Sequence, residues 1–154
     1  SLLDFVRDGP IDRIEVTPVD LVAHALEHLP ADRVTIDLTK APKSMQIDEA
    51  RLTRALQNIV QNAILATPES EKIDLTISEL SGDVVLTVRD RGPGIPAGSE
   101  AHIFEPFMTT RVRGTGLGLP VARRIAEQHR GTLVGENDPD GGAVFRLRFP
   151  RADP

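Results

Sequence analysis

The hydrophobic and polar positions in the first part of the chain predict one helix and two strands. Apolar side chains recur at helical spacing over residues 17–29, where Thr17 can cap the helix and Pro18 suits its first turn. Residues 33–39 alternate between apolar and polar side chains, which is typical of a half-buried strand. A short strand near residues 44–47 is expected to pair with it.

A long amphipathic helix is predicted next, from Asp48 as the capping residue to about Thr67, where Pro68 ends it. Its apolar residues fall on one face and form the stripe expected to be buried: Leu52, Leu56, Ile59, Val60 and Ala63.

Two further pairs of strands and a third helix complete the pattern. Alternating runs at residues 72–80 and 83–90 flank a turn at residues 81–83 and predict a β-hairpin. The remaining elements are a helix over residues 117–129 and a second antiparallel pair over residues 131–137 and 142–149. Strand pairs separated by helices favour an α+β fold, a two-layer α/β sandwich with about three helices on one face of a mixed, mostly antiparallel sheet.

Length and composition narrow the class of protein. The 154 residues suffice for one domain, which we place at residues 17–150, with residues 1–16 as a linker or the end of a preceding helical domain and residues 151–154 as a tail. A net charge of −5 and the absence of Tyr and Trp disfavour nucleic acid as a partner. No cysteine is present, which excludes disulfides and thiolate chemistry.

The sequence also bears on location. No apolar run is long enough to span a membrane, so we expect a cytoplasmic domain without direct membrane contact. Because the chain begins with Ser1 instead of Met, we expect a fragment or processed product, which leaves room for a membrane anchor in a parent protein.

Two motifs place polar side chains on the predicted elements. Asn58 and Asn62 lie one helical turn apart, so both amides project from one face, as they also would on an ordinary solvated helix. Asp90 ends a strand and is followed by Gly92 and Gly94 in the stretch VRDRGPGIP. This stretch suits an ordinary turn, or a ligand whose amine donates to Asp90 while glycine lets it approach the backbone.

The next two motifs lie in the loop over residues 91–114, which is long enough to suggest a function. Phe104 and Phe107 can attach this loop to the core. Thr109, Thr110 and Arg111 offer hydroxyl groups and a cation to a phosphate. Three glycines then alternate where a helix begins, and backbone N–H groups at such a start bind phosphate, although a hinge is the simpler alternative: Gly114, Gly116 and Gly118.

These four motifs, in this order, resemble the ATP-binding catalytic domain of sensor histidine kinases, which has the Bergerat fold shared with gyrase and Hsp90-like ATPases. The resemblance covers residues 48–150, and residues 18–47 match the leading helix and strands. The short loop that ends in TTRVRGTGLGL is most similar to that of nitrogen-regulation and dicarboxylate-sensing kinases.

The resemblance implies that the domain binds ATP and Mg²⁺. Asn62 matches the residue that coordinates Mg²⁺, Asn58 matches one that helps to place metal or water, and Asp90 matches the acceptor for the adenine amino group. Arg111 lies where relatives place a cation near the γ-phosphate, which makes it, with Asn58, a candidate catalytic residue. The other positions matched to the ATP site are Gly92, Gly94, Ile95, Phe107, Thr109, Thr110, Gly114, Thr115, Gly116, Leu117 and Gly118.

Three positions depart from the family pattern. Leu65 and Ala66 replace a basic residue and an aromatic residue that packs on adenine in many relatives, and Ala143 replaces a frequent threonine. These departures leave open a degenerate nucleotide-sensing or protein-binding module that has lost transfer. A gyrase-like or Hsp90-like ATPase is the other alternative, which Asn58 disfavours because those enzymes usually have a glutamate there.

A phospho-accepting histidine is not evident in the sequence. His24 and His28 are expected on a helix surface, His129 is expected to have a structural role near a helix end, and His102 lies in the long loop. The resemblance therefore implies a nucleophile on a histidine-containing dimerisation domain of the parent protein, and a response regulator as the later acceptor. We expect the isolated chain to be a monomer that binds ATP with negligible turnover.

Overall fold

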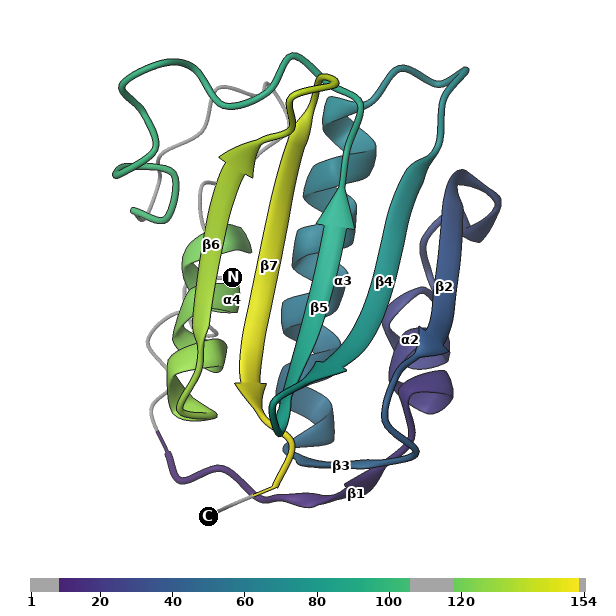
Figure 1. The fold of residues 1–154 in the computed structure, drawn as a ribbon, viewed down its shortest axis with the longest axis vertical. Coiled ribbons are helices and arrows are strands. Elements are labelled where there is room, and N and C mark those ends of the chain that lie inside the picture. The colour runs from purple at the N-terminus through teal and green to yellow at the C-terminus, as the bar shows by residue number, and fades with distance from the viewer. Residues whose placement is uncertain (1–8, 106–117, 153–154) are drawn as a thin grey trace.

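A five-stranded sheet with helices on one face dominates the computed structural model, which describes residues 9–105 and 118–152 (Figure 1). The spatial order of the strands is β2 (Val34–Lys40), β4 (Ile73–Leu80), β5 (Asp83–Arg89), β7 (Ala143–Pro150) and β6 (Thr132–Asn137). β2 and β4 run parallel, whereas the other neighbours are antiparallel. The predicted α+β class and the mixed, mostly antiparallel sheet are confirmed.

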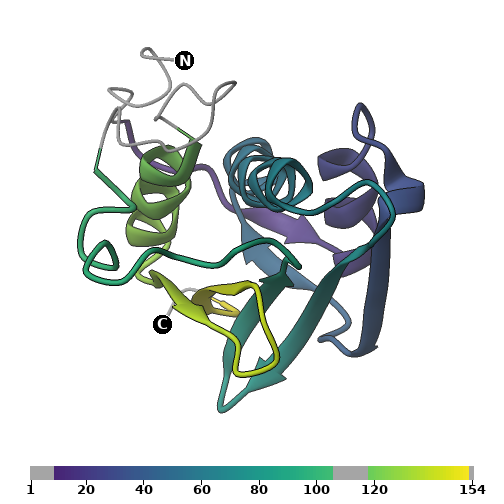
Figure 2. The same ribbon diagram turned by 90° about the horizontal axis from the view of Figure 1, so that it is seen from above.

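The helices of the described ranges lie side by side on the same face of the sheet (Figure 2). They are α2 (Pro18–Ala25), α3 (Glu49–Ala66) and α4 (Gly118–Gln128), and a short 3₁₀ helix, η1 (Ala31–Arg33), precedes β2. The predicted apolar stripe of α3 is buried at all five positions, where it packs in the core shared with the sheet. None of these helices has the length and apolar character needed to cross a membrane.

Two caps fix the starts of the first helices as the sequence predicts. The Thr17 hydroxyl accepts a hydrogen bond from the Asp20 N–H at 3.2 Å, and the Asp48 carboxylate accepts one from the Arg51 N–H at 3.2 Å. Each cap satisfies a donor that the helix itself leaves without a partner.

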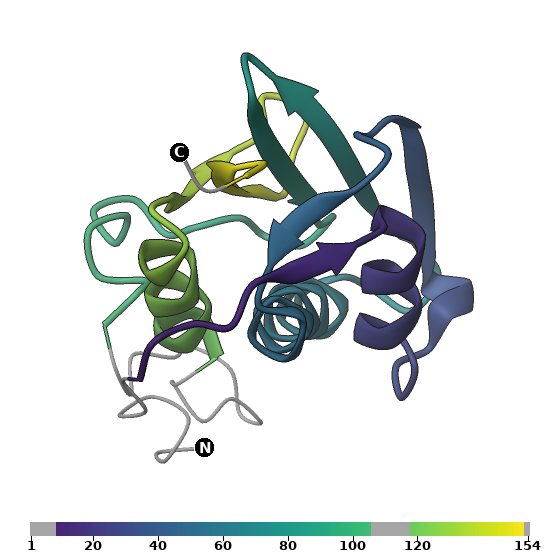
Figure 3. The same cartoon turned by 90° about the horizontal axis from the view of Figure 1, so that it is seen from below.

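A separate two-stranded pair differs from the prediction. β3 (Met45–Ile47) pairs antiparallel with β1 (Ile14–Val16), at one end of the sandwich, and not with the strand at residues 34–40 (Figure 3). β2 instead pairs with β4, and these two strands run parallel. The predicted partner was therefore wrong, and β1 lies in a segment that we expected to be a linker. Three residues are too few to display a strand period.

His129 joins the end of α4 to the start of α3. Its Nε2 accepts a hydrogen bond from the Asp48 N–H at 3.0 Å, so the proton lies on Nδ1, which donates to the Ile125 carbonyl at 2.9 Å. The side chain is buried, its ring has an edge contact with Phe149, and this burial lowers the pKa of His129. The expected structural role is confirmed, but it belongs to a neutral imidazole.

Candidate functional site

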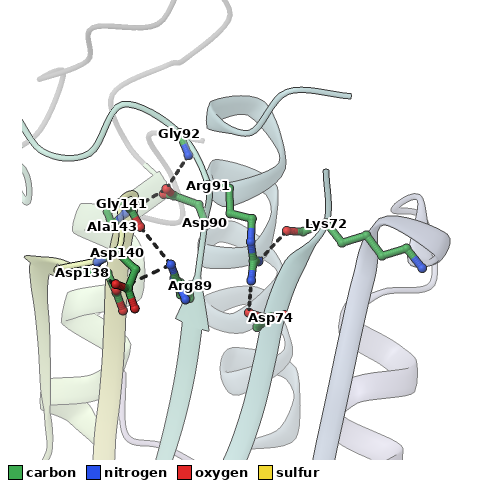
Figure 4. A network of polar contacts seen from close by, with 10 residues as sticks. All are labelled: Lys72, Asp74, Arg89, Asp90, Arg91, Gly92, Asp138, Asp140, Gly141 and Ala143. Atoms are coloured by element: carbon green, nitrogen blue, oxygen red, sulfur yellow. Dashed lines mark hydrogen bonds and ion pairs between the residues drawn. The ribbon is translucent and has the colours of Figure 1, made fainter. Parts of the chain in front are cut away.

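Asp90 is a buried carboxylate directly after β5, with only 2% of its surface exposed. One oxygen, Oδ1, accepts hydrogen bonds from the Gly92 N–H at 3.0 Å and the Ala143 N–H at 2.9 Å (Figure 4). The other oxygen, Oδ2, makes no hydrogen bond to any described residue. The backbone therefore fixes the orientation of this carboxylate while one oxygen stays able to accept from a ligand.

Two glycines allow the chain to close tightly around Asp90. A Cβ on Gly92 would lie 2.4 Å from the Ala66 carbonyl oxygen, at the end of α3. A Cβ on Gly142, which has a φ of +82°, would lie 2.1 Å from the Asp90 carbonyl oxygen. Only glycine fits in these two contacts, because the neighbouring atoms belong to the backbone and cannot rotate away.

The segment after Asp90 is also attached to α3 and β4. The Arg91 N–H donates to the Thr67 hydroxyl at 2.9 Å. The Arg91 guanidinium donates to the Lys72 carbonyl at 2.7 Å and the Asp74 carboxylate at 2.9 Å (Figure 4). Thr67 is itself 6% exposed. This buried hydroxyl is a site-supporting group that the sequence motifs did not indicate.

The turn between β6 and β7 is held in place by Arg89. Its guanidinium donates to the Gly141 carbonyl at 3.2 Å and lies 3.5 Å from the Asp138 carboxylate (Figure 4). The same turn leads into Ala143, whose N–H binds Asp90. Arg89 therefore supports Asp90 through the turn.

The asparagine helix and the glycine motif meet at a second point along α3. The Asn58 side-chain amide donates to the Gly118 carbonyl at 3.1 Å, where α4 begins. Asn62 follows one turn later on the same face and is half-buried. From Asn58 to Ala66, which contacts Gly92, α3 rises about 12 Å.

The two ends of the candidate site thus lie along one helix. Asp90 and Gly92 occupy the end near Ala66, whereas the start of α4 contacts Asn58. This separation suits a ligand that carries a base at one end and phosphate groups at the other.

Several predicted site residues lie outside the described ranges and stay predictions: Phe107, Thr109, Thr110, Arg111, Gly114, Thr115, Gly116 and Leu117. Phe104, just before this segment, packs edge-on against Phe145 with ring centroids 6.3 Å apart, and the Arg123 guanidinium lies 5.5 Å from the Phe104 ring. The expected attachment of the loop to the core is confirmed for Phe104.

The donor set near Asn58 suits a metal that arrives with phosphate. No group of three or more His, Cys, Asp or Glu side chains that could hold a metal occurs in the described part of the chain. The amide oxygens of Asn58 and Asn62 are neutral oxygen ligands of the kind that Mg²⁺ accepts alongside phosphates and water. His24, which was expected on a helix surface, is exposed there and contacts Glu49 at 3.2 Å.

The departures from the family pattern fall at the Asp90 end. Leu65 is 43% exposed, and Ala66 presents its main chain to Gly92. Ala143 meets Asp90 through its backbone N–H, so this contact does not depend on the side chain that replaces threonine.

The chain matches one protein family, described as histidine kinase-, DNA gyrase B- and HSP90-like ATPase, over residues 47–153. Sensor histidine kinase ZraS of Escherichia coli strain K12 is 41% identical over 164 residues, which cover all of this chain and 35% of ZraS. Sporulation kinase A of Bacillus subtilis strain 168 is 38% identical over 104 residues, or 68% of this chain and 17% of that kinase. The chain therefore spans about a third or less of these relatives.

Solved structures of kinases share the fold. The catalytic domain of histidine kinase ThkA is 31% identical, with a TM-score of 0.79 over 92% of this chain and 97% of that domain. ThkA in complex with the response regulator TrrA is 28% identical, with a TM-score of 0.79 over 97% of this chain and 45% of ThkA. Full-length ShkA in complex with AMPPNP is 26% identical, with a TM-score of 0.86 over 99% of this chain and 35% of ShkA.

Proposed function

The chain belongs to the family of histidine kinase-, DNA gyrase B- and HSP90-like ATPases, and within it to the catalytic domains of histidine kinases. We propose that it binds Mg-ATP and donates the γ-phosphoryl group to a histidine of a separate dimerisation domain. The observation that carries the proposal is the Asp90 carboxylate, which is buried and fixed through Oδ1, with Oδ2 left for a ligand.

Asp90 would select the base. Its Oδ2 accepts a hydrogen bond from the exocyclic amine of adenine, whereas guanine has a carbonyl at that position, which cannot donate. Asp90 is only 2% exposed, so little water reaches the carboxylate to replace this bond when it is lost. The site therefore favours ATP over GTP.

Asn58, Asn62 and the glycines at the start of α4 would place the phosphates. Mg²⁺, when bound through Asn62, would neutralise phosphate charge, while free N–H groups at the helix start orient the phosphate oxygens. A nitrogen of the incoming histidine then attacks the γ-phosphorus in line, the bond to the bridging oxygen breaks, and ADP leaves. In this proposal the chain contributes positioning, and the separate dimerisation domain contributes the nucleophile. His129 in particular is buried with both ring nitrogens engaged.

A self-sufficient ATPase is less well supported. The residue at the position of the usual general base is Asn58, whose amide cannot take a proton from water and already donates to Gly118. The complex of the relative ThkA with TrrA supports a response regulator as the later partner of the parent protein. We accordingly propose that the domain works in the cytoplasm, where ATP and such regulators occur.

Transfer in trans tests the proposal. The chain is incubated with γ-labelled ATP, with and without the separately purified dimerisation domain of its parent protein. We expect acid-labile, base-stable label on the added domain only, and no label when its histidine is replaced by alanine or when Asp90→Asn is used.

The alternative functions give different results in the same assay. Hydrolysis of ATP at a similar rate without the added domain would indicate an independent ATPase. Binding of ATP without any labelling of the added domain would indicate a module that has lost transfer. Either result contradicts the proposed transfer.

A further inference from the structure

The side-chain amide of Asn137 makes a pair of hydrogen bonds with one residue of the Asp90 motif. Asn137 is the last residue of β6, and its Oδ1 accepts from the Ile95 N–H at 2.7 Å while its Nδ2 donates to the Ile95 carbonyl at 3.1 Å. The two residues lie 42 positions apart in the sequence. The amide thus binds both backbone groups of Ile95, as a neighbouring strand would.

Ile95 has no other polar attachment in the described residues. Its backbone groups make no hydrogen bond besides those to Asn137, and its side chain is 7% exposed within the hydrophobic core. Removal of the Asn137 amide would leave both backbone groups of Ile95 without a protein partner.

Gly94, the last glycine of the motif, leaves the space that Asn137 occupies. A Cβ on Gly94 would lie 2.6 Å from the Asn137 Oδ1, and the residue has a φ of +83°, which favours glycine. Gly94 is thus required both for its backbone conformation and for the approach of the Asn137 amide.

The β6–β7 hairpin contacts the motif at two points. The Ala143 N–H, at the start of β7, binds the Asp90 carboxylate, and Asn137, at the end of β6, binds Ile95. The two contacts lie on either side of one short turn, which Arg89 holds. One hairpin therefore binds both the Asp90 carboxylate and the Ile95 backbone and relates their positions.

We propose that Asn137 is a positioning residue of the nucleotide site, which keeps the segment from Gly92 to Ile95 in register with the Asp90 carboxylate. The inference rests on the proposed function, because the segment is expected to border the adenine base. Asn137 acts through Ile95 and need not touch the nucleotide.

The test compares Asn137→Ala with Glu136→Ala in the whole chain. Glu136 precedes Asn137 on β6, is also exposed, and pairs with Arg146, so its removal is a matched change on the opposite face of the strand. We expect Asn137→Ala to weaken the affinity for both ADP and a non-hydrolysable ATP analogue about tenfold, and Glu136→Ala to leave it unchanged. The factor by which the affinity falls should be equal with and without Mg²⁺, because the substitution weakens contacts with the base and not with the phosphates.

Further readouts separate positioning from general stability. Without nucleotide, hydrogen exchange of the Ile95 amide should accelerate in Asn137→Ala and not in Glu136→Ala, while the thermal midpoints of both variants stay close to that of the wild type. Asn137→Asp keeps an acceptor for the Ile95 N–H but loses the donor and puts an oxygen opposite the Ile95 carbonyl. It should therefore not restore the affinity.

The outcomes distinguish this inference from the proposed function. Wild-type affinity in Asn137→Ala, or a matching loss in Glu136→Ala, overturns the role of Asn137 and leaves nucleotide binding intact. A large drop in the thermal midpoint of Asn137→Ala without nucleotide also overturns it, in favour of a purely structural role. No binding by the folded wild type contradicts the proposed function itself, and the positioning role with it.

Discussion

Asp90 and His129 are both buried polar side chains, and their hydrogen bonds separate a candidate binding residue from a structural one. His129 uses both ring nitrogens within the protein, one as donor and one as acceptor. Asp90 uses one carboxylate oxygen twice, and its other oxygen has no bond to the described residues. The second carboxylate oxygen of Asp90 is therefore available as an acceptor, which makes Asp90 the candidate binding residue of the two.

The buried imidazole predicts a dependence of stability on pH. Burial lowers the pKa of His129 below its ordinary value of 6.5, so the unfolded chain takes up a proton at a pH where the folded chain does not. The unfolded state then binds more protons, and stability falls as the pH drops below about 6.5. The thermal midpoint, followed from about pH 7.5 to 5.5, should therefore fall more steeply in the wild type than in His129→Gln.

An exposed histidine is the control for this measurement. His28 lies on the surface after α2, and His28→Gln should leave the slope of the wild type unchanged. Equal slopes in the wild type and His129→Gln would contradict the account of His129.

At the scale of elements, α3 carries both ends of the candidate site. Its middle contacts the start of α4 through Asn58, and its C-terminal end packs on Gly92. The start of the helix is fixed by Asp48, which also accepts a hydrogen bond from the Asp12 N–H at 3.0 Å. The rise of α3 between Asn58 and Ala66 therefore sets how far apart the two ends of the site lie.

Removal of the cap should destabilise the fold measurably. We expect Asp48→Ala to lower the free energy of unfolding by about 1–2 kcal/mol, because the Arg51 N–H and the Asp12 N–H both lose their acceptor. Urea denaturation measures this loss. Glu49→Ala removes a charge of the same sign at the next position, and it should lower the free energy of unfolding by only a few tenths of the loss in Asp48→Ala. Equal losses in the two variants would show that charge, and not capping, stabilises the helix.

Long periodic elements could be predicted from the sequence, and very short ones could not. The stripe of α3 and the alternation of β4 and β5 extend over enough residues to display a period. β1 and β3 have three residues each, and their pairing depends on where the chain places them.

The same contrast holds within the site. Asn58, Asp90 and the glycines belong to local motifs, and the structure brings Asn58 to Gly118 and Gly92 to Asp90. Thr67 and Asn137 act on the backbone of residues 24 and 42 positions away, respectively. No local pattern indicates such contacts, so the sequence alone does not predict a role for a threonine after a helix or an asparagine at a strand end.

At the scale of the whole molecule, elements far apart in the sequence meet around the candidate site. One helix, one hairpin and the segment after Asp90 converge on the base end of the site, and the helices share a single core with the sheet (Figures 1 and 4). Such support is what the proposed function requires, because a domain that donates a phosphoryl group to a separate acceptor acts by positioning its nucleotide.

The most direct test is calorimetric titration of a non-hydrolysable ATP analogue into the wild type and Asp90→Asn, with and without Mg²⁺. Asparagine keeps an oxygen for the Gly92 and Ala143 N–H groups but presents an NH₂ group to the adenine amine. We predict that the wild type binds more tightly with Mg²⁺, and that Asp90→Asn stays folded but binds roughly 100-fold more weakly. Equal affinity in the two folded proteins would contradict the assignment of Asp90 as the adenine acceptor.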